Sequence, residues 1–391
     1  MELAPDDHPT RLAFREWLAE HPNPTDRQLA ESGYVAPHWP KPYGLGAGPM
    51  DQLIIDEEIE RAGITRPQNA IGIGWAGPTI IHAGTQEQKD RYLLPILAGE
   101  EIWCQMFSEP GSGSDLANLS TRAERDGDVF RVNGQKIWTS GAHNSAFGIL
   151  IARSDPDAPK HKGISYFICP TDLPGIELRP IIDMTTAYSF NEVFFTDAEV
   201  PAENLVGTEH DGWRLAKVTL ANERVSLSTG GVLWGMGPKT DDLIDLVRSS
   251  GGSADPIMRQ RLADTYIEGK ILDLIRQRTL MAQLAGKGIG PEASIRKILA
   301  DEHGQKVMTL AKDLAGAAGM LEGSGPGLGG NTRSRQGEET WHWGYLFSQA
   351  LTIGGGTGEV QRNIVAERVL GLPREPDQSR GMTWRETQHA R

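Results

Sequence analysis

The first hundred residues alternate between amphipathic stretches and short breaks. Apolar residues recur at helical spacing around 12–18, 53–62 and 86–97, which places them on one face of a helix in each case. Proline- and glycine-rich segments such as HWPKPYGLGAGP separate these stretches. This pattern predicts an N-terminal helical domain over residues 1–104.

The pattern changes over residues 105–210, where apolar residues come in short runs. One run begins at Val129, reaches the dipeptide Asn133–Gly134, which is typical of a hairpin turn, and resumes at Ile137. Further runs typical of strands follow at 147–152, 164–169 and 193–195. We therefore expect a central β domain.

Helical periodicity returns over residues 211–391. Two apolar stripes recur at helical spacing: Ile267, Ile271, Leu274 and Ile275, then Val307, Leu310, Ala311, Leu314 and Ala318. Residues 322–339 are rich in glycine and polar residues, which predicts an exposed loop. Its GxGxxG string lacks the strand before it and the helix after it that a dinucleotide fingerprint requires. The order of segments predicts an α+β multidomain chain.

Composition excludes several classes of protein. Lys and Arg total 39 against 52 acidic residues among 391, a net charge of −13 that disfavours nucleic acid or an anionic membrane as partner. Cys104 and Cys169 are the two cysteines, and they lack the spacing of metal ligands, so we expect no metal site and a reducing compartment. The sequence shows neither a membrane-spanning run nor a signal peptide at MELAPDDHPTRLAF. These features favour a soluble, cytoplasmic protein.

Candidate chemistry is concentrated between Gln105 and Ser140. The string WCQMFSEP leads into the turn GSGSD, whose backbone N–H groups and hydroxyls suit a phosphate. Farther on, Trp138 offers an aromatic face beside the hydroxyls of Thr139 and Ser140. Two ordinary alternatives stay open here: the glycine-serine segment as a plain turn, and Trp138 as a core residue.

A candidate general base lies on the helix expected after Asp211. Glu223 falls on the same stripe as the apolar residues Trp213, Ala216, Leu220 and Leu227. A carboxylate on such a face loses water, which raises its pKa and strengthens it as a base. The alternative is that Glu223 pairs with a basic group, such as Arg224 or a residue of another helix.

The string SEPGSGSDLANLSTRAERDGDVFRVNGQKIWTSGAH resembles the signature of the acyl-CoA dehydrogenase family, and the likeness extends from about Ala70 to Arg374. The resemblance implies an N-terminal helical domain, a central β-barrel or sandwich domain and a C-terminal four-helix bundle. It also implies FAD as cofactor, an acyl-CoA substrate and a dimeric or tetrameric assembly.

The same resemblance assigns roles to individual residues. It places FAD contacts at Met106, Phe107, Ser108, Gly113, Ser114, Trp138, Thr139, Ser140, Thr357 and Glu359. In this assignment Gly113 and Ser114 meet the pyrophosphate, while Trp138 flanks the isoalloxazine ring. It places substrate contacts at Ser114, Arg224, Gly355 and Gly356.

The resemblance also bears on the base. Many members carry it in a Tyr-Glu-Gly-Thr string, but the matching residues here are Gly354, Gly355, Gly356 and Thr357. Isovaleryl-type and long-chain-type members place a glutamate on a helix just before an arginine, as Glu223 stands before Arg224. Glu223 is thus implied as the base for the α-proton, with flavin N5 as hydride acceptor and an electron-transfer flavoprotein as the next carrier. The Gly355 N–H would donate to the thioester oxygen, unless the triplet only starts a helix.

Two departures from the family pattern concern the subunit interface. The region SADPIMRQRLADTY lacks the usual arginine and phenylalanine three residues apart, and LAGAAGML at 314–321 replaces the usual Gln-Ile-Phe-Gly-Gly. The chain would use other residues there or pair with a distinct, related chain. An oxygen-using oxidase and a non-catalytic flavin-binding subunit stay open as alternatives, with a nucleic-acid-binding protein disfavoured by the net charge. The acyl group, whether branched, long-chain or a steroid side chain, also stays open.

Overall fold

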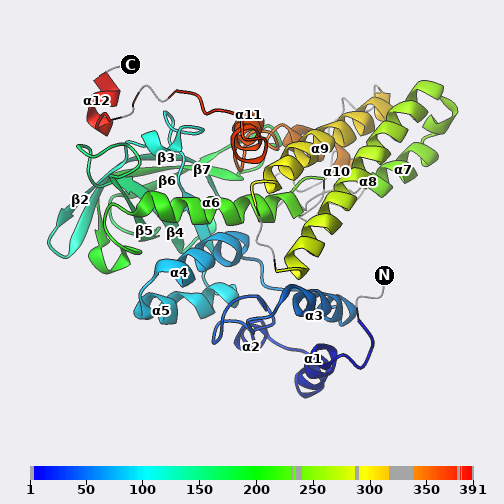
Figure 1. Ribbon diagram of the computed structural model, residues 1–391, viewed down its shortest axis with the longest axis horizontal. Helices are drawn as coiled ribbons and strands as arrows, with labels where there is room; N and C mark the ends of the chain where they lie inside the picture. The colour runs from blue at the N-terminus through cyan, green and yellow to red at the C-terminus, as the bar shows by residue number, and fades with distance from the viewer. Residues whose placement is uncertain are drawn as a thin grey trace. The chain divides into compact units, whose positions relative to one another are not determined.

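The protein divides into two compact units (Figure 1). The computed structural model describes residues 4–229, 232–234, 240–286, 290–316, 338–376, 379 and 381–389. Residues 1–180, 190–222 and 379–391 form the first unit, and residues 181–189 and 223–378 form the second.

The N-terminal part of the first unit is helical, as the apolar periodicity predicts. Its elements are α1 (Pro9–Glu20), α2 (Asp26–Glu31), α3 (Pro49–Arg61), a π-helical turn (Gly72–Ala76), α4 (Gly77–Ala83) and α5 (Gln86–Leu97). Thr25 and Thr85 each form a capping box at a helix start, which satisfies backbone N–H groups that the helix leaves open. Phe14, Ile55 and Leu93 lie in the shared core of these helices.

The rest of the first unit is built on one sheet. Its strands are β1 (Trp103–Met106), β2 (Arg122–Asp126), β3 (Val129–Ser140), β4 (Phe147–Arg153), β5 (Ile164–Pro170), β6 (Ile176–Ile181) and β7 (Phe190–Pro201). The order is β1-β4-β2-β3-β7-β6, with β5 paired to β4, and β1 runs parallel to β4.

Strands β4 and β5 are buried on both faces. Ile149 and Ile151 pack into the core shared with the N-terminal helices, while Leu150 and Ala152 pack into a second cluster with Phe167. A strand covered on both sides needs apolar residues at successive positions. This explains why these strands read as continuous apolar runs in the sequence.

The prediction of a hairpin turn at Asn133–Gly134 is wrong. Both residues lie inside β3, where the pairing with β7 shifts register between Val132 and Gly134, as in a β-bulge. The Asn133 side chain donates to the Asp197 carboxylate at 2.9 Å and accepts from the Asp197 backbone N–H at 2.9 Å. The tight turn lies instead between the paired residues Asp126 and Val129, where Gly127 has a φ of 61°.

Helix α6 (Gly212–Thr229) begins in the first unit and ends in the second. The second unit continues with α7 (Thr240–Ser249), α8 (Pro256–Leu284), α9 (Ala293–Ala315), α10 (Glu338–Ser348), α11 (Gly358–Ile364) and a π-helical turn (Val365–Val369). Helices α7 to α10 pack around a core that includes Val307, Leu310 and Phe347. The glycine-rich segment 322–339 lies outside the described residues except for its last two, which begin α10.

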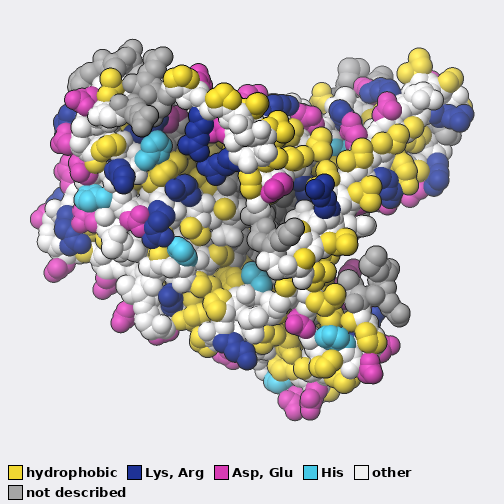
Figure 2. Space-filling view, viewed as in Figure 1, with side chains coloured by type: hydrophobic (Ala, Val, Ile, Leu, Met, Phe, Trp, Pro, Cys, Tyr) yellow, Lys and Arg dark blue, Asp and Glu magenta, His cyan; other side chains and the backbone are white. Residues whose placement is uncertain are grey.

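The two predicted apolar stripes differ in environment. The α9 stripe is largely buried, as Val307 and Leu310 show. The α8 stripe is exposed within this unit, with Ile267 at 54 % and Leu274 at 62 % exposure. Hydrophobic side chains are accordingly visible on the surface of the molecule (Figure 2). Across the described ranges, no helix combines the length and apolar composition needed to cross a bilayer.

Candidate functional site

Two segments that carry most of the expected cofactor residues lie side by side in the first unit. The Ile137 backbone N–H donates to the Ser108 carbonyl at 2.9 Å, and the Lys136 Nζ donates to the Phe107 carbonyl at 3.0 Å. The structure thus brings Met106, Phe107 and Ser108 next to the strand that carries Trp138, Thr139 and Ser140. The side chains of Met106 and Phe107 are buried in the core, which leaves only their backbones for a ligand.

A buried ion pair joins these segments. The Lys136 Nζ lies 2.8 Å from Glu109 Oε1, and the two side chains are 0 % and 4 % exposed. The carboxylate also accepts from the backbone N–H groups of Ser120 at 2.6 Å and Thr121 at 2.9 Å. Burial alone would raise the pKa of Glu109, but the Lys136 charge and these donors outweigh it and lower the pKa to about 2.

Sequence reasoning missed this pair. The signal that could have found it is strand alternation, because Lys136 falls on the same inward face as Phe130 and Val132. A lysine at an inward position is seldom fully buried without a partner. The partner, Glu109, lies 27 residues earlier in the chain, so the sequence alone does not identify it.

The glycine-serine turn presents two of its residues to solvent. The Ser112 side chain is buried and donates to the Asp115 carbonyl at 2.7 Å, so this hydroxyl shapes the turn. Gly113 and Ser114 are exposed, and a Cβ added at Gly113 would meet no atom within 4 Å. The open space over Gly113 fits the close approach of a phosphate to the backbone.

Trp138 is not a core residue. Its side chain is 57 % exposed, its φ is 61°, and the pairing of β3 with β7 shifts register between Lys136 and Thr139. A non-glycine residue with positive φ is uncommon, and such residues are frequent at ligand sites. The bulge turns the indole outward, where it packs edge-on against Phe190 with ring centroids 5.9 Å apart.

Thr139, next to this exposed indole, carries an unsatisfied polar atom. Its side chain is buried, and its Oγ1 has no hydrogen-bond partner in the part of the chain that the structure describes. The Asn191 amide donates to the Thr139 carbonyl at 3.0 Å and so fixes the backbone there. Ser140 is exposed. A buried hydroxyl without a partner costs free energy unless a ligand supplies one, so these residues fit a bound flavin.

Glu223 lies on α6 and is 7 % exposed. Ala216 on the same helix is buried, while Trp213 and Leu220 are half-buried against the core of the first unit. One turn before Glu223, the Thr219 hydroxyl lies 3.0 Å from the Tyr166 hydroxyl and thereby ties α6 to β5. Glu223 is therefore low in solvent access, as a strong carboxylate base requires, and its catalytic role stays a prediction.

Backbone geometry explains two of the three glycines in the triplet of the second unit. Gly355 and Gly356 have φ values of 65° and 90°, which side chains rarely allow. The buried Gln361 donates to the Gly355 carbonyl at 3.1 Å, and the Thr357 hydroxyl accepts from the Val360 N–H at 3.3 Å. The triplet therefore forms the loop that starts α11. Donation from Gly355 to a substrate stays a prediction, and the side chain of Arg224 lies outside the described residues.

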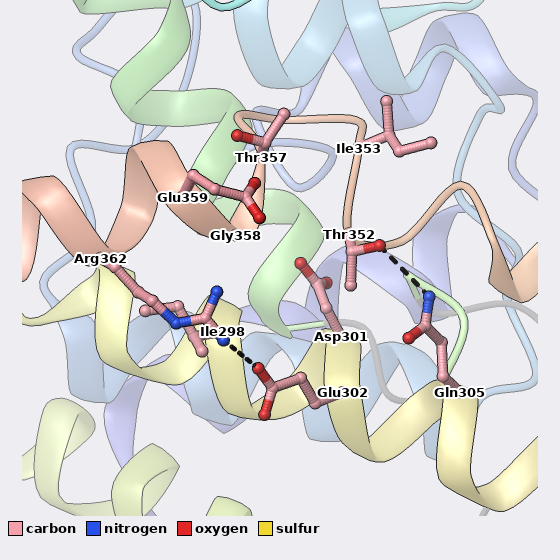
Figure 3. A pocket seen from close by; sticks show the side chains of 10 residues that line it. All are labelled: Ile298, Asp301, Glu302, Gln305, Thr352, Ile353, Thr357, Gly358, Glu359 and Arg362. Atoms are coloured by element: carbon pink, nitrogen blue, oxygen red, sulfur yellow. Dashed lines mark hydrogen bonds and ion pairs between the residues drawn. The ribbon is translucent and has the colours of Figure 1, made fainter.

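A polar cavity of about 400 Å³ lies beside this loop (Figure 3). It is lined by Ile298, Asp301, Glu302, Gln305, Thr352, Ile353, Thr357, Gly358, Glu359 and Arg362. Glu302 and Arg362 form an ion pair at 2.5 Å across it. Burial raises the pKa of Asp301, although its partner Lys297 at 2.6 Å opposes the rise. The cavity contains Thr357 and Glu359, the two cofactor residues expected in this unit.

Sequence models of three acyl-CoA dehydrogenase domains match the chain: the N-terminal domain over residues 9–100, the middle domain over 104–198 and the C-terminal domain over 210–370. The chain belongs to the acyl-CoA dehydrogenase family. The expected architecture of a helical N-terminal part, a central sheet and a helical C-terminal part is confirmed.

Curated members of the acyl-CoA dehydrogenase family are similar over most of this chain. Acyl-CoA dehydrogenase FadE34 of Mycobacterium tuberculosis is 40 % identical over 346 residues, which cover 88 % of this chain and 46 % of FadE34. The chain thus spans about half the length of that relative. Acyl-CoA dehydrogenase IpdE1 of the same organism is 38 % identical over 353 residues, covering 90 % of this chain and 88 % of IpdE1.

Solved structures of similar proteins have the same fold. The Tcur3481-Tcur3483 steroid ACAD superposes with a TM-score of 0.76 and 33 % identity, covering 90 % of this chain and 88 % of that one. The ChsE4-ChsE5 complex from Mycobacterium tuberculosis superposes with a TM-score of 0.73 and 32 % identity, covering 95 % and 94 %.

Proposed function

We propose that this chain is an FAD-dependent acyl-CoA dehydrogenase that converts an acyl-CoA thioester to its trans-2-enoyl thioester. Two neighbouring side chains carry the proposal: the indole of Trp138 is exposed, and the hydroxyl of Thr139 is buried without a hydrogen-bond partner among the described residues. Both lie in the segment whose sequence resembles the flavin signature of the family. When bound, FAD supplies the hydride acceptor at flavin N5.

The chain's own contribution to the reaction is removal of the α-proton. That proton is only weakly acidic, so the base must be poorly hydrated and the thioester carbonyl must be polarised. Glu223 meets the first requirement with 7 % exposure. Donation from the Gly355 N–H to the thioester oxygen would meet the second. The proton moves from the substrate Cα to the Glu223 carboxylate.

The substrate class we propose is a CoA thioester with a steroid side chain. The support is similarity to a protein described as a steroid ACAD, at 33 % identity over 90 % of this chain. Placement of the base on α6, with glycine in the C-terminal loop, also leaves that loop without a side chain that would occupy room next to the substrate.

We also propose that the chain assembles with a related chain and passes electrons to an electron-transfer flavoprotein. The similar ChsE4-ChsE5 structure is a complex of two chains. The segment SADPIMRQRLADTY, which leads into α8 and forms its first turns, lacks the arginine and phenylalanine that the family resemblance leads one to expect at a subunit interface. A related partner chain could supply such residues in their place.

The test is anaerobic reduction of the bound flavin by a panel of acyl-CoA thioesters. The wild-type chain, alone or with a related partner chain, should lose its flavin absorbance with a steroid-side-chain thioester. Glu223→Gln should bind the same thioester but reduce the flavin at least about a hundredfold more slowly, because a general base is worth about 10² to 10⁴ in rate. Glu60→Gln, at an exposed position of α3, is the matched control. Equal rates for Glu223→Gln and wild type would refute the assignment.

The second candidate is a non-catalytic, flavin-binding subunit, which the glycine at position 355 favours. It predicts a yellow chain that no thioester bleaches, even with the partner present. An oxidase is the third outcome, and it predicts that air reoxidises the reduced flavin as fast as an electron-transfer flavoprotein does.

A further inference from the structure

The end of the described chain returns to the sheet of the first unit. Helix α12 (Trp384–His389) is anchored there by its backbone, since the Trp384 N–H donates to the Ala158 carbonyl at 2.8 Å and the Arg385 N–H donates to the Pro156 carbonyl at 3.0 Å. Its side chains reach Asn118. The Trp384 indole N–H donates to the Asn118 carbonyl at 3.3 Å, and the Gln388 amide donates to its side-chain oxygen at 2.8 Å.

Arg153, at the end of β4, lies beneath this helix. Its residue surface is 1 % exposed, and its guanidinium lies 5.1 Å from the Trp384 ring centroid, in cation–π contact. The guanidinium donates to the carbonyls of Ala117 at 2.7 Å and Lys160 at 2.8 Å. Trp384 therefore covers the group that holds the backbone of the Leu116–Asn118 segment.

That segment directly follows the glycine-serine turn and is bonded to it. The Ser112 hydroxyl donates to the carbonyls of Asp115 at 2.7 Å and Leu116 at 3.2 Å. A continuous set of contacts therefore runs from α12 through Asn118 and Arg153 to the turn that presents Gly113. The C-terminal family model ends at residue 370, so α12 lies beyond the part of the chain that it matches.

We propose that α12 is a positioning element of the cofactor site, with Trp384 and Arg153 holding the glycine-serine turn in the shape that binds the FAD pyrophosphate. The proposal rests on the proposed function in that it takes FAD as the ligand. Neither side chain need touch the cofactor. Their effect is to reduce the motion of residues 111–119 before the cofactor binds, so that less ordering is required on binding.

The experiment measures two quantities in the 391-residue chain. The first is the dissociation constant of FAD, and the second is hydrogen exchange of residues 111–119 in the cofactor-free protein. For Trp384→Ala we expect about tenfold weaker FAD binding, the effect of losing one cation–π contact and one hydrogen bond. Exchange in residues 111–119 should also become faster. Trp384→Phe keeps a ring over Arg153 and should recover most of both quantities.

Met382→Ala is the matched control, because this exposed residue of the same segment lies outside the contacts to Asn118 and Arg153. A chain that stops after residue 378 should behave like Trp384→Ala. If Trp384→Ala lowers thermal stability but leaves both FAD affinity and exchange at 111–119 unchanged, α12 has only a general structural role and the proposal fails. If the wild type binds no FAD, the proposed function fails, and the exchange measurement still decides whether α12 orders the turn.

Discussion

Replacing Lys136 by methionine should show that the buried ion pair with Glu109 holds the two cofactor segments together. Lys136→Met keeps an unbranched side chain of similar length on the inward face of β3 but removes the charge. It leaves the Glu109 carboxylate buried at 4 % side-chain exposure, with only the donors from Ser120 and Thr121. It also leaves the Phe107 carbonyl without its donor at 3.0 Å.

The expected loss of stability can be estimated in two ways. The pKa of Glu109 falls from its ordinary value of 4.5 to about 2, so the net effect of burial, the Lys136 charge and the Ser120 and Thr121 donors is about 3 kcal/mol, at about 1.36 kcal/mol per pKa unit. Removing one partner of a buried ion pair typically costs about 3–5 kcal/mol. We therefore expect Lys136→Met to lower the free energy of unfolding by about 3 kcal/mol.

The dependence on pH has a defined sign. Because the folded-state pKa of Glu109 lies below its unfolded value, its contribution to stability is fully present above about pH 4.5 and is lost as the pH falls toward about 2. In Lys136→Met, burial without the lysine charge should raise the pKa of Glu109. The destabilisation by the substitution should therefore be smaller at pH 4 than at pH 7.

Urea unfolding of the cofactor-free protein at both pH values is the assay. Glu109→Gln and the double variant Glu109→Gln/Lys136→Met complete the cycle, and the double variant should be less destabilised than the sum of the two single variants because no unpaired charge remains. Lys162→Met, at an exposed lysine, is the control. A loss below about 1 kcal/mol in Lys136→Met, or strict additivity in the cycle, would refute the reasoning.

Three further predictions concern single residues. Thr139→Val removes a buried hydroxyl that has no partner among the described residues, so FAD should bind about fivefold to tenfold more weakly while the cofactor-free protein keeps its stability. Titration with FAD measures the affinity and urea unfolding measures the stability. A loss of stability with unchanged FAD affinity would contradict this prediction. At Gly134, where φ is 149°, alanine would place a Cβ 2.7 Å from the Thr121 Cα, so Gly134→Ala should lower the free energy of unfolding by about 1–3 kcal/mol. Gly127 lies in a turn with a φ of 61°, and Gly127→Asn should lower the free energy of unfolding by less than about 1 kcal/mol. Glu223→Asp keeps the charge but shortens the side chain, so we expect intermediate flavin reduction rates between wild type and Glu223→Gln; rates equal to wild type would argue against direct proton transfer.

Much of the fold and part of the site could be predicted from local pattern. The helices of the N-terminal part, the doubly buried strands β4 and β5 and the α9 stripe follow from apolar spacing, because side-chain burial repeats with the period of each element. The position of Glu223 on the apolar stripe of α6 likewise predicted the low exposure of its side chain. The stripe on α8 has the same spacing and is exposed within its unit, so periodicity identifies a helix without identifying what covers it.

The sequence by itself determined the order of elements, the family and the segments that carry the candidate cofactor residues, since each depends on residues close together in the chain. Tertiary structure decided the rest. Asn133–Gly134 continues the strand, opposite a bulge in β7, because β7, about 60 residues later, pairs along the whole of β3. Lys136 forms an ion pair with Glu109, and the Trp384 ring lies in cation–π contact with Arg153. In both pairs the residues are too far apart in the sequence for local periodicity to predict the contact. The free energy of burying a charged group depends on which groups lie next to it, and these neighbours come from distant parts of the sequence. Only the tertiary structure determines which groups these are.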